Sequence, residues 1–434
     1  MIAGVTVMVF NNSTAYNLTS RVYGAACSTN CVPGQFGRGT ASFDFLNNDG
    51  AMTPGNGGTY SSVDWFSMGI SIPFTTSQGY GTCFAGIITD FSLVDDGKNS
   101  FVRITAVDGF AIGGSTATTV NTGATTVAGT VKYWIDSFFN GNSTYITSVG
   151  MPKLGGTVAT AVGTDVGRSS TGLATKNYSA TGRALDFVNN SVMPAGPNFA
   201  WPTDITSSGT AMYYNYNCAN LYPLRATSTV AFTFAQSPTS GQLPIQNLVR
   251  KFNSDDLLND SSVATLPIIF DGSTYTDTEE NTASKSLYGN RTISLNAILP
   301  GAVTGANSQL PGSANSSAGT VAQRWANTYS SVSFVTDSLV VSDTSMTTNA
   351  NNSSSINAYT KLLDISQGVL QLAQVKYKPT GGAATRTDNV IIMGRDIQFT
   401  LDDVRIRVNF MIANRSAFIL NDTVLGVLDT NRLG

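Results

Sequence analysis

The 434-residue chain contains no histidine, and this absence restricts its chemistry more than any other feature of the sequence. Without imidazole there is no Ser-His-Asp or Cys-His nucleophile, no HExxH zinc centre and no histidine acid–base step. Glutamate occurs only as the adjacent pair Glu279 and Glu280. A retaining glycosidase needs two carboxyls that face each other about 5 Å apart, whereas neighbours on a strand point to opposite faces. We therefore predict no catalytic residue and expect this pair in a solvated loop.

Aspartate also occurs in adjacent pairs, at 95–96, 255–256 and 402–403, each beside turn signals. Aspartate in such positions hydrogen-bonds to the backbone of its own turn. These pairs therefore indicate turns and not acid–base dyads.

The four cysteines are Cys27, Cys31, Cys83 and Cys218. "CSTNC" at 27–31 has the spacing of half a metal site, but no second half and no histidine completes it. A Cys27–Cys31 disulfide in an oxidising setting remains an alternative. Cys83, in the apolar run "GTCFAGIITDF", is expected to be a buried packing thiol. We predict no metal and no cofactor.

The composition indicates which elements carry these residues. Hydrophobic residues make up 41% of the chain, but charged residues only 12%, about half the usual share. The polar surface must then come from Thr, Ser, Asn and Gly, which favour strands and turns over exposed helices. The sequence predicts a mainly β protein of the α+β kind.

Charge and hydropathy exclude two kinds of partner. The net charge of −3, without a basic cluster, gives no surface that would hold nucleic acid or anionic lipid. No run of about 20 apolar residues is present, so we expect no membrane-spanning segment. The first residues alternate like a strand and lack the basic n-region of a signal peptide.

The pattern along the chain divides it into three parts. Residues 1–130 contain strand-like runs separated by turn signals, which predicts an N-terminal antiparallel β-barrel domain. Residues 131–228 predict a small mixed α+β domain, with helical spacing at 183–193 and a hairpin within 209–227. The spacing at 131–140 is also helical, with a strand as the alternative. Residues 229–434 return to β character and predict a second β-barrel domain with a C-terminal tail. Helices are expected at 319–332 and within 349–366.

The stretch "GQFGRGTASFDFLNNDGAMTP", residues 34–54, predicts a strand that ends in a hairpin turn. Phe43 and Phe45 share one face with Ala41, and the polar residues between them share the other. Asn48, Asp49 and Gly50 are typical of a tight turn.

Several segments resemble minor tail proteins of long-tailed bacteriophages, especially those infecting actinobacteria. "TSRVYG", "LNNDGAMTP" and the run "CFAGIITDFSLVDDGKNSFVRITAVDGFAI" are similar to the N-terminal part of that family. "SKSLYGNRTISLNAIL" and the C-terminal "FILNDTVLGVLDTNRLG" are similar to later parts, in the same order along the chain. The chain departs from the family in its longer Gly/Thr-rich insertions and in its lack of histidine.

The resemblance implies a structural, non-enzymatic component of the tail tip or baseplate hub, made in the host cytoplasm and incorporated into the virion. Its two β domains would be tail-tube-like barrels that flank the small domain. Copies of the chain would form a ring, as a homotrimer or alternatively a hexamer, through which DNA passes. Other partners would be the distal tail or tail tube protein, the tape measure protein and other tail-tip proteins.

The hairpin at 40–60 then either lines the channel or docks on the adjacent subunit, through Phe43, Phe45, Asn48, Asp49 and Gly50. An internal barrel hairpin with a solvated tip is the alternative. Two other functions also stay open. Aromatic residues in "MYYNYNCANLY", 212–222, could bind host glycan in a receptor-binding or adhesin tail protein. The Thr/Asn/Gly bias also fits a capsid-like shell protein.

Overall fold

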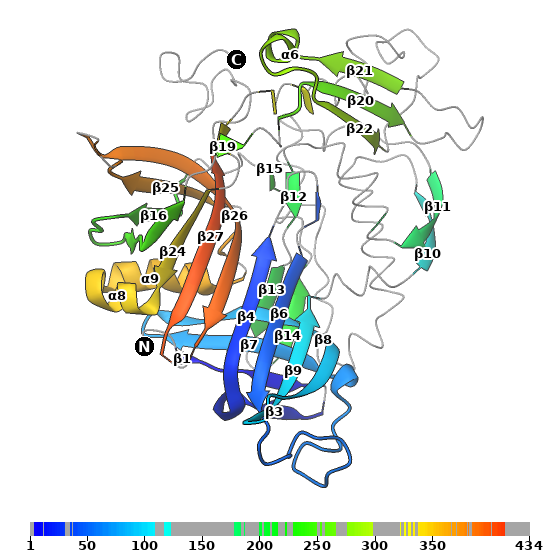
Figure 1. Cartoon of the computed structure of the whole chain (residues 1–434), viewed down its shortest axis with the longest axis vertical. Helices are drawn as coiled ribbons and strands as arrows, with labels where there is room; N and C mark the ends of the chain where they lie inside the picture. The colour runs from blue at the N-terminus through cyan, green and yellow to red at the C-terminus, as the bar shows by residue number, and fades with distance from the viewer. Residues whose placement is uncertain are drawn as a thin grey trace.

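The structure is a computed structural model of the whole chain. It describes residues 4–108, 229–265, 276–297 and 337–412 with short gaps, and between these ranges only single strands and isolated residues (Figure 1). Most of the described residues lie in strands, which confirms the mainly β class. The predicted helix at 131–140, most of that at 183–193 and the C-terminal tail lie outside the described residues.

Most N-terminal strands follow the predicted runs, but two strands, at 15–17 and 22–30, were not predicted. The second of these, β4 Val22–Asn30, consists from Gly24 onward mostly of small residues without a clear alternation. The others are β1 Gly4–Val5, β2 Met8–Phe10, β3 Ala15–Asn17, β6 Arg38–Leu46, β7 Gly69–Thr76, β8 Gly79–Asp95 and β9 Ser100–Val107. Two 3₁₀ turns, η1 Thr19–Arg21 and η2 Trp65–Ser67, precede β4 and β7.

The predicted hairpin between β8 and β9 is confirmed, and its turn is held by its own carboxylates. Asp95 Oδ1 accepts a hydrogen bond from the backbone N–H of Gly97 at 2.8 Å. Asp96 Oδ1 accepts from the N–H groups of Lys98 at 2.9 Å and Asn99 at 2.6 Å. Gly97 has φ 78°, a conformation that favours glycine. The Asp95–Asp96 pair therefore has the turn role that its sequence predicts.

The C-terminal part combines strands with two consecutive helices. Ser342 caps α8 with a capping box, and the Asn352 side chain accepts from the N–H of Ser355 to cap α9. The helix α9 lies within the predicted range 349–366, whereas α8 was not predicted. The elements are β16 Phe232–Ala235, β17 Leu243–Pro244, β18 Asn247–Val249, β24 Asp337–Ser342, α8 Asp343–Asn349, α9 Ser353–Leu363, β25 Leu372–Tyr377, β26 Arg386–Phe399 and β27 Val404–Ile412.

The two β regions share one sheet, which the sequence did not indicate. Antiparallel pairing of β4 with β26 runs from Asn30 opposite Gly394 to Ala25 opposite Phe399. The resulting order is β17-β16-β25-β26-β4-β6-β9-β8-β7-β2-β3, and Figure 1 shows the blue β4 beside the orange β26. Buried apolar residues from both regions form one hydrophobic cluster. The regions 1–130 and 229–434 are therefore joined by backbone hydrogen bonds as well as by packing.

Within the described ranges this strand order is an open path and does not show the closed barrels that we predicted. One segment of the C-terminal region nevertheless contacts two strands in turn. Leu243 lies opposite Phe234 of β16, and the N–H of Ile245 donates to the carbonyl of Ala235 at 3.0 Å. The N–H of Gln246 then donates to Val340 of β24 at 2.9 Å, after which β18 continues along β24. The segment 243–249 thus links β16 to β24.

Smaller sheets lie outside this main sheet. One contains β20 Asp260–Thr265, β21 Thr276–Glu280 and β22 Thr292–Ala297, with helix α6 Thr282–Tyr288. Glu279 and Glu280 lie in β21, so the expectation of a loop was wrong; they continue the alternation of a strand that pairs with β20. The short pairs are β10 Ala117–Thr122 with β11 Tyr178–Arg183, β13 Asp204–Ser208 with β14 Ala211–Asn215, and β19 Phe252–Asn253 with β23 Ser333–Phe334; β12 Phe199–Trp201 lies between β5 Gln35–Phe36 and β15 Tyr222–Pro223.

Two further predictions concern the middle and later parts of the chain. The hairpin of β13 and β14 begins earlier than the predicted range 209–227. Ala322, Trp325 and Ala326 are helical and buried, in agreement with the helix predicted at 319–332.

Candidate functional site: the junction of the two β regions

The sequence-predicted site residues divide into a buried pair and an exposed turn. Phe43 and Phe45 are 1% and 0% exposed, and their rings stack in the core with centroids 5.9 Å apart. Their side chains are therefore not accessible to another chain. Asn48 and Asp49 are exposed, and Gly50 has φ 65°.

The chain after β6 does not return as the second strand of a hairpin. β6 is already paired with β4 on one side and β9 on the other, so no edge is free for a returning strand. Residues 47–64, the 47–64 loop, instead fold back on the end of the sheet. The fully buried side chain of Asn47 accepts from the N–H of Met52 at 2.8 Å and donates to Thr53 Oγ1 at 2.9 Å.

An ion pair fastens the same loop to η1. Arg21 Nη2 lies 2.6 Å from Asp49 Oδ2, and Arg21 Nη1 donates to Asp49 Oδ1 at 2.9 Å. The hydrogen bonds from Arg21 and from the N–H of Ala51 lower the pKa of Asp49 to about 2. The Arg21 guanidinium also lies over the ring of Tyr60, 5.4 Å from its centroid. The N–H of Ser100 also donates to Asn48 Oδ1 at 2.7 Å, so the loop is held by buried and exposed contacts that all come from the N-terminal region.

The junction between the two β regions contains a buried arginine. Arg395 of β26 is 1% exposed. Its Nη1 donates to the carbonyl of Leu362 at 2.7 Å and to that of Leu363, and its Nη2 donates to the carbonyl of Cys83 at 3.0 Å. Carbonyls at the end of a helix such as α9 lack intrahelical partners and carry partial negative charge. One side chain therefore joins β26, the end of α9 and β8.

Burial lowers the pKa of Arg395, since the charged form loses its hydration. The Nε of Arg395 has no hydrogen-bond partner among the described residues. Gly368 allows the close approach, because a Cβ there would lie 2.7 Å from the Leu362 carbonyl and 3.0 Å from Arg395 Nη1. The sequence analysis missed this residue, although a single arginine inside the apolar strand "NVIIMGRDIQFT" is an available signal.

Further contacts fix α9 against β8. The N–H of Ile365 donates to the carbonyl of Thr82 at 2.9 Å, and the hydroxyls of Thr76 and Thr360 are 2.7 Å apart. Cys27 and Cys83 face the same interior as buried free thiols, and burial raises the pKa of Cys27 to about 12. The packing role predicted for Cys83 is confirmed. Cys27 is a free thiol here, and Cys31, its partner in the disulfide alternative, lies outside the described residues.

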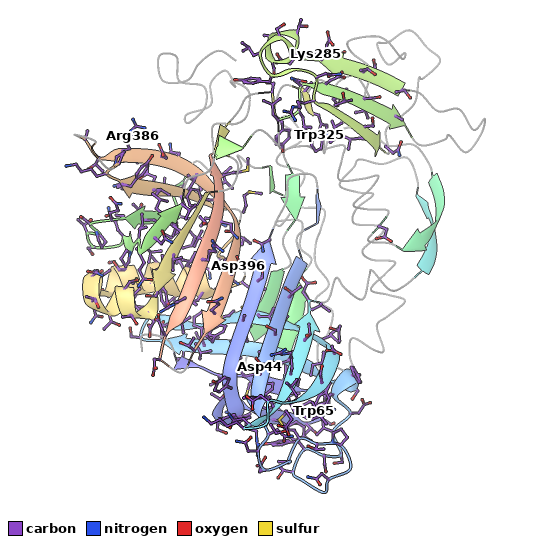
Figure 2. All side chains as sticks on the ribbon, in the orientation of Figure 1. Asp44, Trp65, Lys285, Trp325, Arg386 and Asp396 are labelled. Atoms are coloured by element: carbon purple, nitrogen blue, oxygen red, sulfur yellow. The ribbon has the colours of Figure 1, made fainter. Side chains whose placement is uncertain are left out.

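A second polar group spans the junction on the opposite face of the sheet. Ser28 Oγ and Asn30 Nδ2 of β4 donate to Asp396 Oδ1 at 2.6 and 3.3 Å. Asn409 Nδ2 of β27 donates to Asp396 Oδ2 at 3.1 Å. Figure 2 shows Asp396 where the two regions meet. The strands β4, β26 and β27 are thus linked by side chains as well as by backbone.

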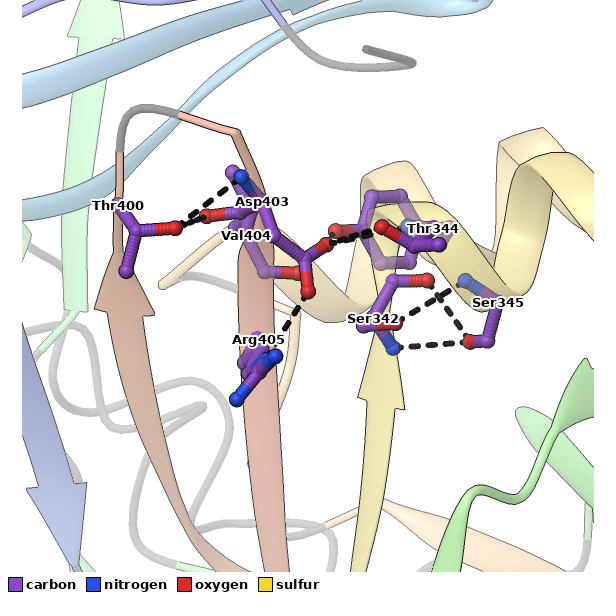
Figure 3. A network of polar contacts seen from close by, with 8 residues as sticks. Ser342, Thr344, Ser345, Thr400, Asp403, Val404 and Arg405 are labelled. Atoms are coloured by element: carbon purple, nitrogen blue, oxygen red, sulfur yellow. Dashed lines mark hydrogen bonds and ion pairs between the residues drawn. The ribbon is translucent and has the colours of Figure 1, made fainter.

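A third network anchors the helices to the turn between β26 and β27 (Figure 3). Asp403, the second residue of a predicted turn pair, accepts from the N–H and the Oγ1 of Thr344, each at 3.1 Å. Arg405 Nε donates to its other oxygen at 3.0 Å. The Tyr359 hydroxyl donates to the carbonyl of Val404 at 3.3 Å, and burial raises the pKa of this tyrosine. This anchoring places the end of α9 within reach of Arg395.

Other titratable groups form local pairs. Lys285 lies 2.6 Å from Glu280 and 3.5 Å from Asp260, which lowers the pKa of Glu280. Within the described residues no three metal-binding side chains gather, and no helix is long and apolar enough to cross a membrane. The contacts at the junction are structural, because they position strands and helices relative to one another.

Known proteins with a similar structure exist. No family model and no curated protein matches the sequence. In structure, the chain is similar to the prophage MuSo2 43 kDa tail protein from Shewanella oneidensis, with TM-score 0.51 and 8% identity over 95% of this chain and 99% of that one. It is also similar to a tail protein from Neisseria meningitidis MC58, with TM-score 0.48 and 10% identity over 94% and 96% of the two chains. The prophage tail protein gp18 from Listeria monocytogenes EGD-e gives 0.41 and 9% over 93% and 94%.

Only the first of these three TM-scores exceeds 0.5, and at 8% sequence identity this likeness shows a shared fold and no more. That likeness extends over nearly the whole of both chains. The chain therefore has the fold of a bacteriophage tail protein, in agreement with the resemblance found in its sequence.

Proposed function

We propose that this chain is a structural component of a bacteriophage virion, located in the tail tip or baseplate hub. The observation that carries the proposal is the fold likeness to a prophage tail protein across 95% of the chain. The ordered sequence resemblance to minor tail proteins supports the same conclusion independently. The chemistry of the junction, in which polar groups serve to hold elements together, is consistent with a structural role.

In this proposal the regions 1–130 and 229–434 act as two tail-tube-like barrel units with the segment 131–228 between them. The link that residues 243–249 make between β16 and β24 supports a cyclic strand order in the second unit. Several copies, three or alternatively six, form a ring that connects the tail tube to the tip. The neighbours are the tail tube or distal tail protein, the tape measure protein and other tail-tip proteins.

The solvent face at the centre of the main sheet suits the wall of a DNA channel. Ala26, Ser28, Thr40 and Ser42 lie there on β4 and β6, outside the core. The charged residues on this face stand opposite one another with opposite sign, Asp44 with Arg103 and Asp396 with Arg407, so they balance. A basic wall would retain DNA by releasing its counterions, whereas a neutral polar wall lets it pass. The exposed turn residues Asn48 and Asp49 remain candidates for contact with an adjacent chain. Phe43 and Phe45 serve in this proposal to fix the strand that carries the turn.

The experiment that tests this function is a cryo-EM map of the particle, supported by gold labelling of a tagged chain. We expect density for a small ring of this fold at the end of the tail. Hundreds of copies in the head would instead indicate a shell protein. A position at the tip of a side fibre would indicate a receptor-binding protein.

A further inference from the structure

An apolar row crosses the solvent face of the N-terminal sheet near the 47–64 loop. In the strand register Leu46 lies opposite Phe101, and Phe101 lies opposite Val94. These residues point away from the core, because their neighbours Phe45 and Val102 are fully buried. Tyr23 of β4 is 56% exposed and places its ring 5.2 Å from that of Phe101. Four adjacent strands thus carry Tyr23, Leu46, Phe101 and Val94 on the solvent face as one row, in which Tyr23 is exposed and the other three are half-buried.

Unpaired acidic residues border this row. Asp95 and Asp96 follow Val94 in the hairpin turn and are exposed, with hydrogen bonds to backbone only. They form no ion pair with a described residue, whereas Asp44 on the same face is paired with Arg103 at 2.8 Å. Lys98 offsets one of their two charges, so the turn keeps a net charge of −1 (two aspartates, one lysine). An aromatic centre with a charged rim is typical of a protein–protein interface.

The other side of the main sheet carries cations that are unpaired among the described residues. The hairpin of β25 and β26 ends in Lys376, Lys378 and Arg386, which are half-buried, exposed and exposed. None of the three forms an ion pair within the part of the chain that the structure describes. Asp388, further along β26, is the nearest acidic residue in the sequence. Figure 2 shows Arg386 far from Asp44 and Trp65, which mark the end of the molecule that carries the row.

We propose that these two ends form the contact between successive copies of this chain, with the apolar row and its acidic rim docking on the basic end of the β25–β26 hairpin. A ring of identical subunits requires a heterologous contact, in which two different and complementary surfaces meet at every interface. The chain presents such a pair, with opposite charges at opposite ends of one sheet. This inference rests on the ring proposed above and names the surfaces that close it.

The test is the oligomeric state of the full chain by analytical ultracentrifugation over a range of concentrations. We expect Tyr23→Ser to raise the dissociation constant about tenfold, since an exposed aromatic anchor is lost. Tyr80→Ser is the matched control, because Tyr80 lies on β8 and is 71% exposed but stands outside the row. It should leave association unchanged.

Charge variants test whether the two ends meet each other. Asp95→Asn with Asp96→Asn keeps the side-chain acceptors of the turn but removes the charges, and should weaken association, as should Lys378→Glu with Arg386→Glu. A chain that combines Lys378→Glu and Arg386→Glu with Asp95→Asn and Asp96→Asn should associate better than the chain with the two Glu changes alone, because like charges no longer face each other. Lys361→Glu, an exposed cation on α9, is the control.

The outcomes separate this inference from the ring itself. If the wild type assembles and all of these variants assemble equally well, the ring stands and this contact is wrong. If both single-end variants weaken association but the combined variant associates no better than the chain with the two Glu changes alone, the pairing of these ends is wrong. If the wild type is monomeric both in solution and in its native particle, both this contact and the proposed ring are wrong.

Discussion

The junction at β4 and β26 and the 47–64 loop are both places where the chain secures an irregular connection, and they do so in different ways. The loop uses residues of the N-terminal region alone, such as Asn47 with Met52 and Asn48 with Ser100, and a partly exposed ion pair. The junction uses residues hundreds of positions apart, such as Arg395 and Cys83, and buries them completely. The comparison suggests that the loop is set locally, whereas the junction forms only when both regions have folded. Changes at the junction should therefore affect the whole molecule, and changes in the loop only one end of it.

The largest effect should come from Arg395→Met. This change leaves three buried carbonyls without their donor, and each costs roughly 1–3 kcal/mol, so we expect a loss of about 3 kcal/mol or more in the free energy of unfolding. Chemical denaturation measures it. The rate of backbone amide hydrogen exchange should also increase, both at the end of α9 and in β8. Arg407→Met, at an exposed position on the neighbouring strand, is the matched control and should change stability by less than about 0.5 kcal/mol. Equal effects of the two variants would contradict the role of Arg395.

Asn47→Ala should have an intermediate effect confined to the loop. It removes the acceptor for the N–H of Met52 and the donor to Thr53, at an expected cost of about 2 kcal/mol. Exchange should rise at 47–64 and stay unchanged at α9. Thr59→Ala, at an exposed position in the same loop, provides the comparison. A rise in exchange at α9 would show that the loop and the junction are coupled.

Asp403→Ala should weaken the junction indirectly, through α8. It removes the acceptor of the Thr344 N–H at the first turn of that helix, at a cost of about 1 kcal/mol, typical of a lost cap. Asp402→Ala, which alters the exposed neighbour, should cost less. Thermal melting of both variants measures the difference. A larger effect from Asp402 would contradict the network in Figure 3.

The smallest effect should be the pH dependence from Asp49. Its pKa of about 2 in the folded chain is below that of an unfolded aspartate, about 3.9. The stabilisation is therefore present above about pH 4 and is lost as the pH falls toward 2. Because the pair is partly exposed, we expect under about 1 kcal/mol. The difference in the free energy of unfolding between the wild type and Asp49→Asn should shrink as the pH is lowered from 5 to 2. A constant difference would rule out this titration.

Local sequence patterns predicted the strands and turns better than they predicted which strands lie next to each other. The strand with Phe43 and Phe45 and the turn at Asp95 and Asp96 were correct, because alternation and turn chemistry act over a few residues. The predicted return of the chain as a second hairpin strand after Gly50 was wrong, because that return depends on which strands already flank β6. β4 was not predicted, since from Gly24 onward its mostly small residues do not alternate between apolar and polar types. Arg395 was not recognised, because the role of an isolated charge in a strand depends on partners that the sequence does not identify.

The sequence by itself determined the β class, most strands and turns, and the exclusion of imidazole chemistry, since these follow from residue type and short-range spacing. Only the tertiary structure decided that β4 pairs with β26 and that Arg395 reaches the end of α9. Such contacts join residues more than 300 positions apart in the case of Cys83 and Arg395. Their stability depends on burial and on complete hydrogen bonding, which no single segment contains.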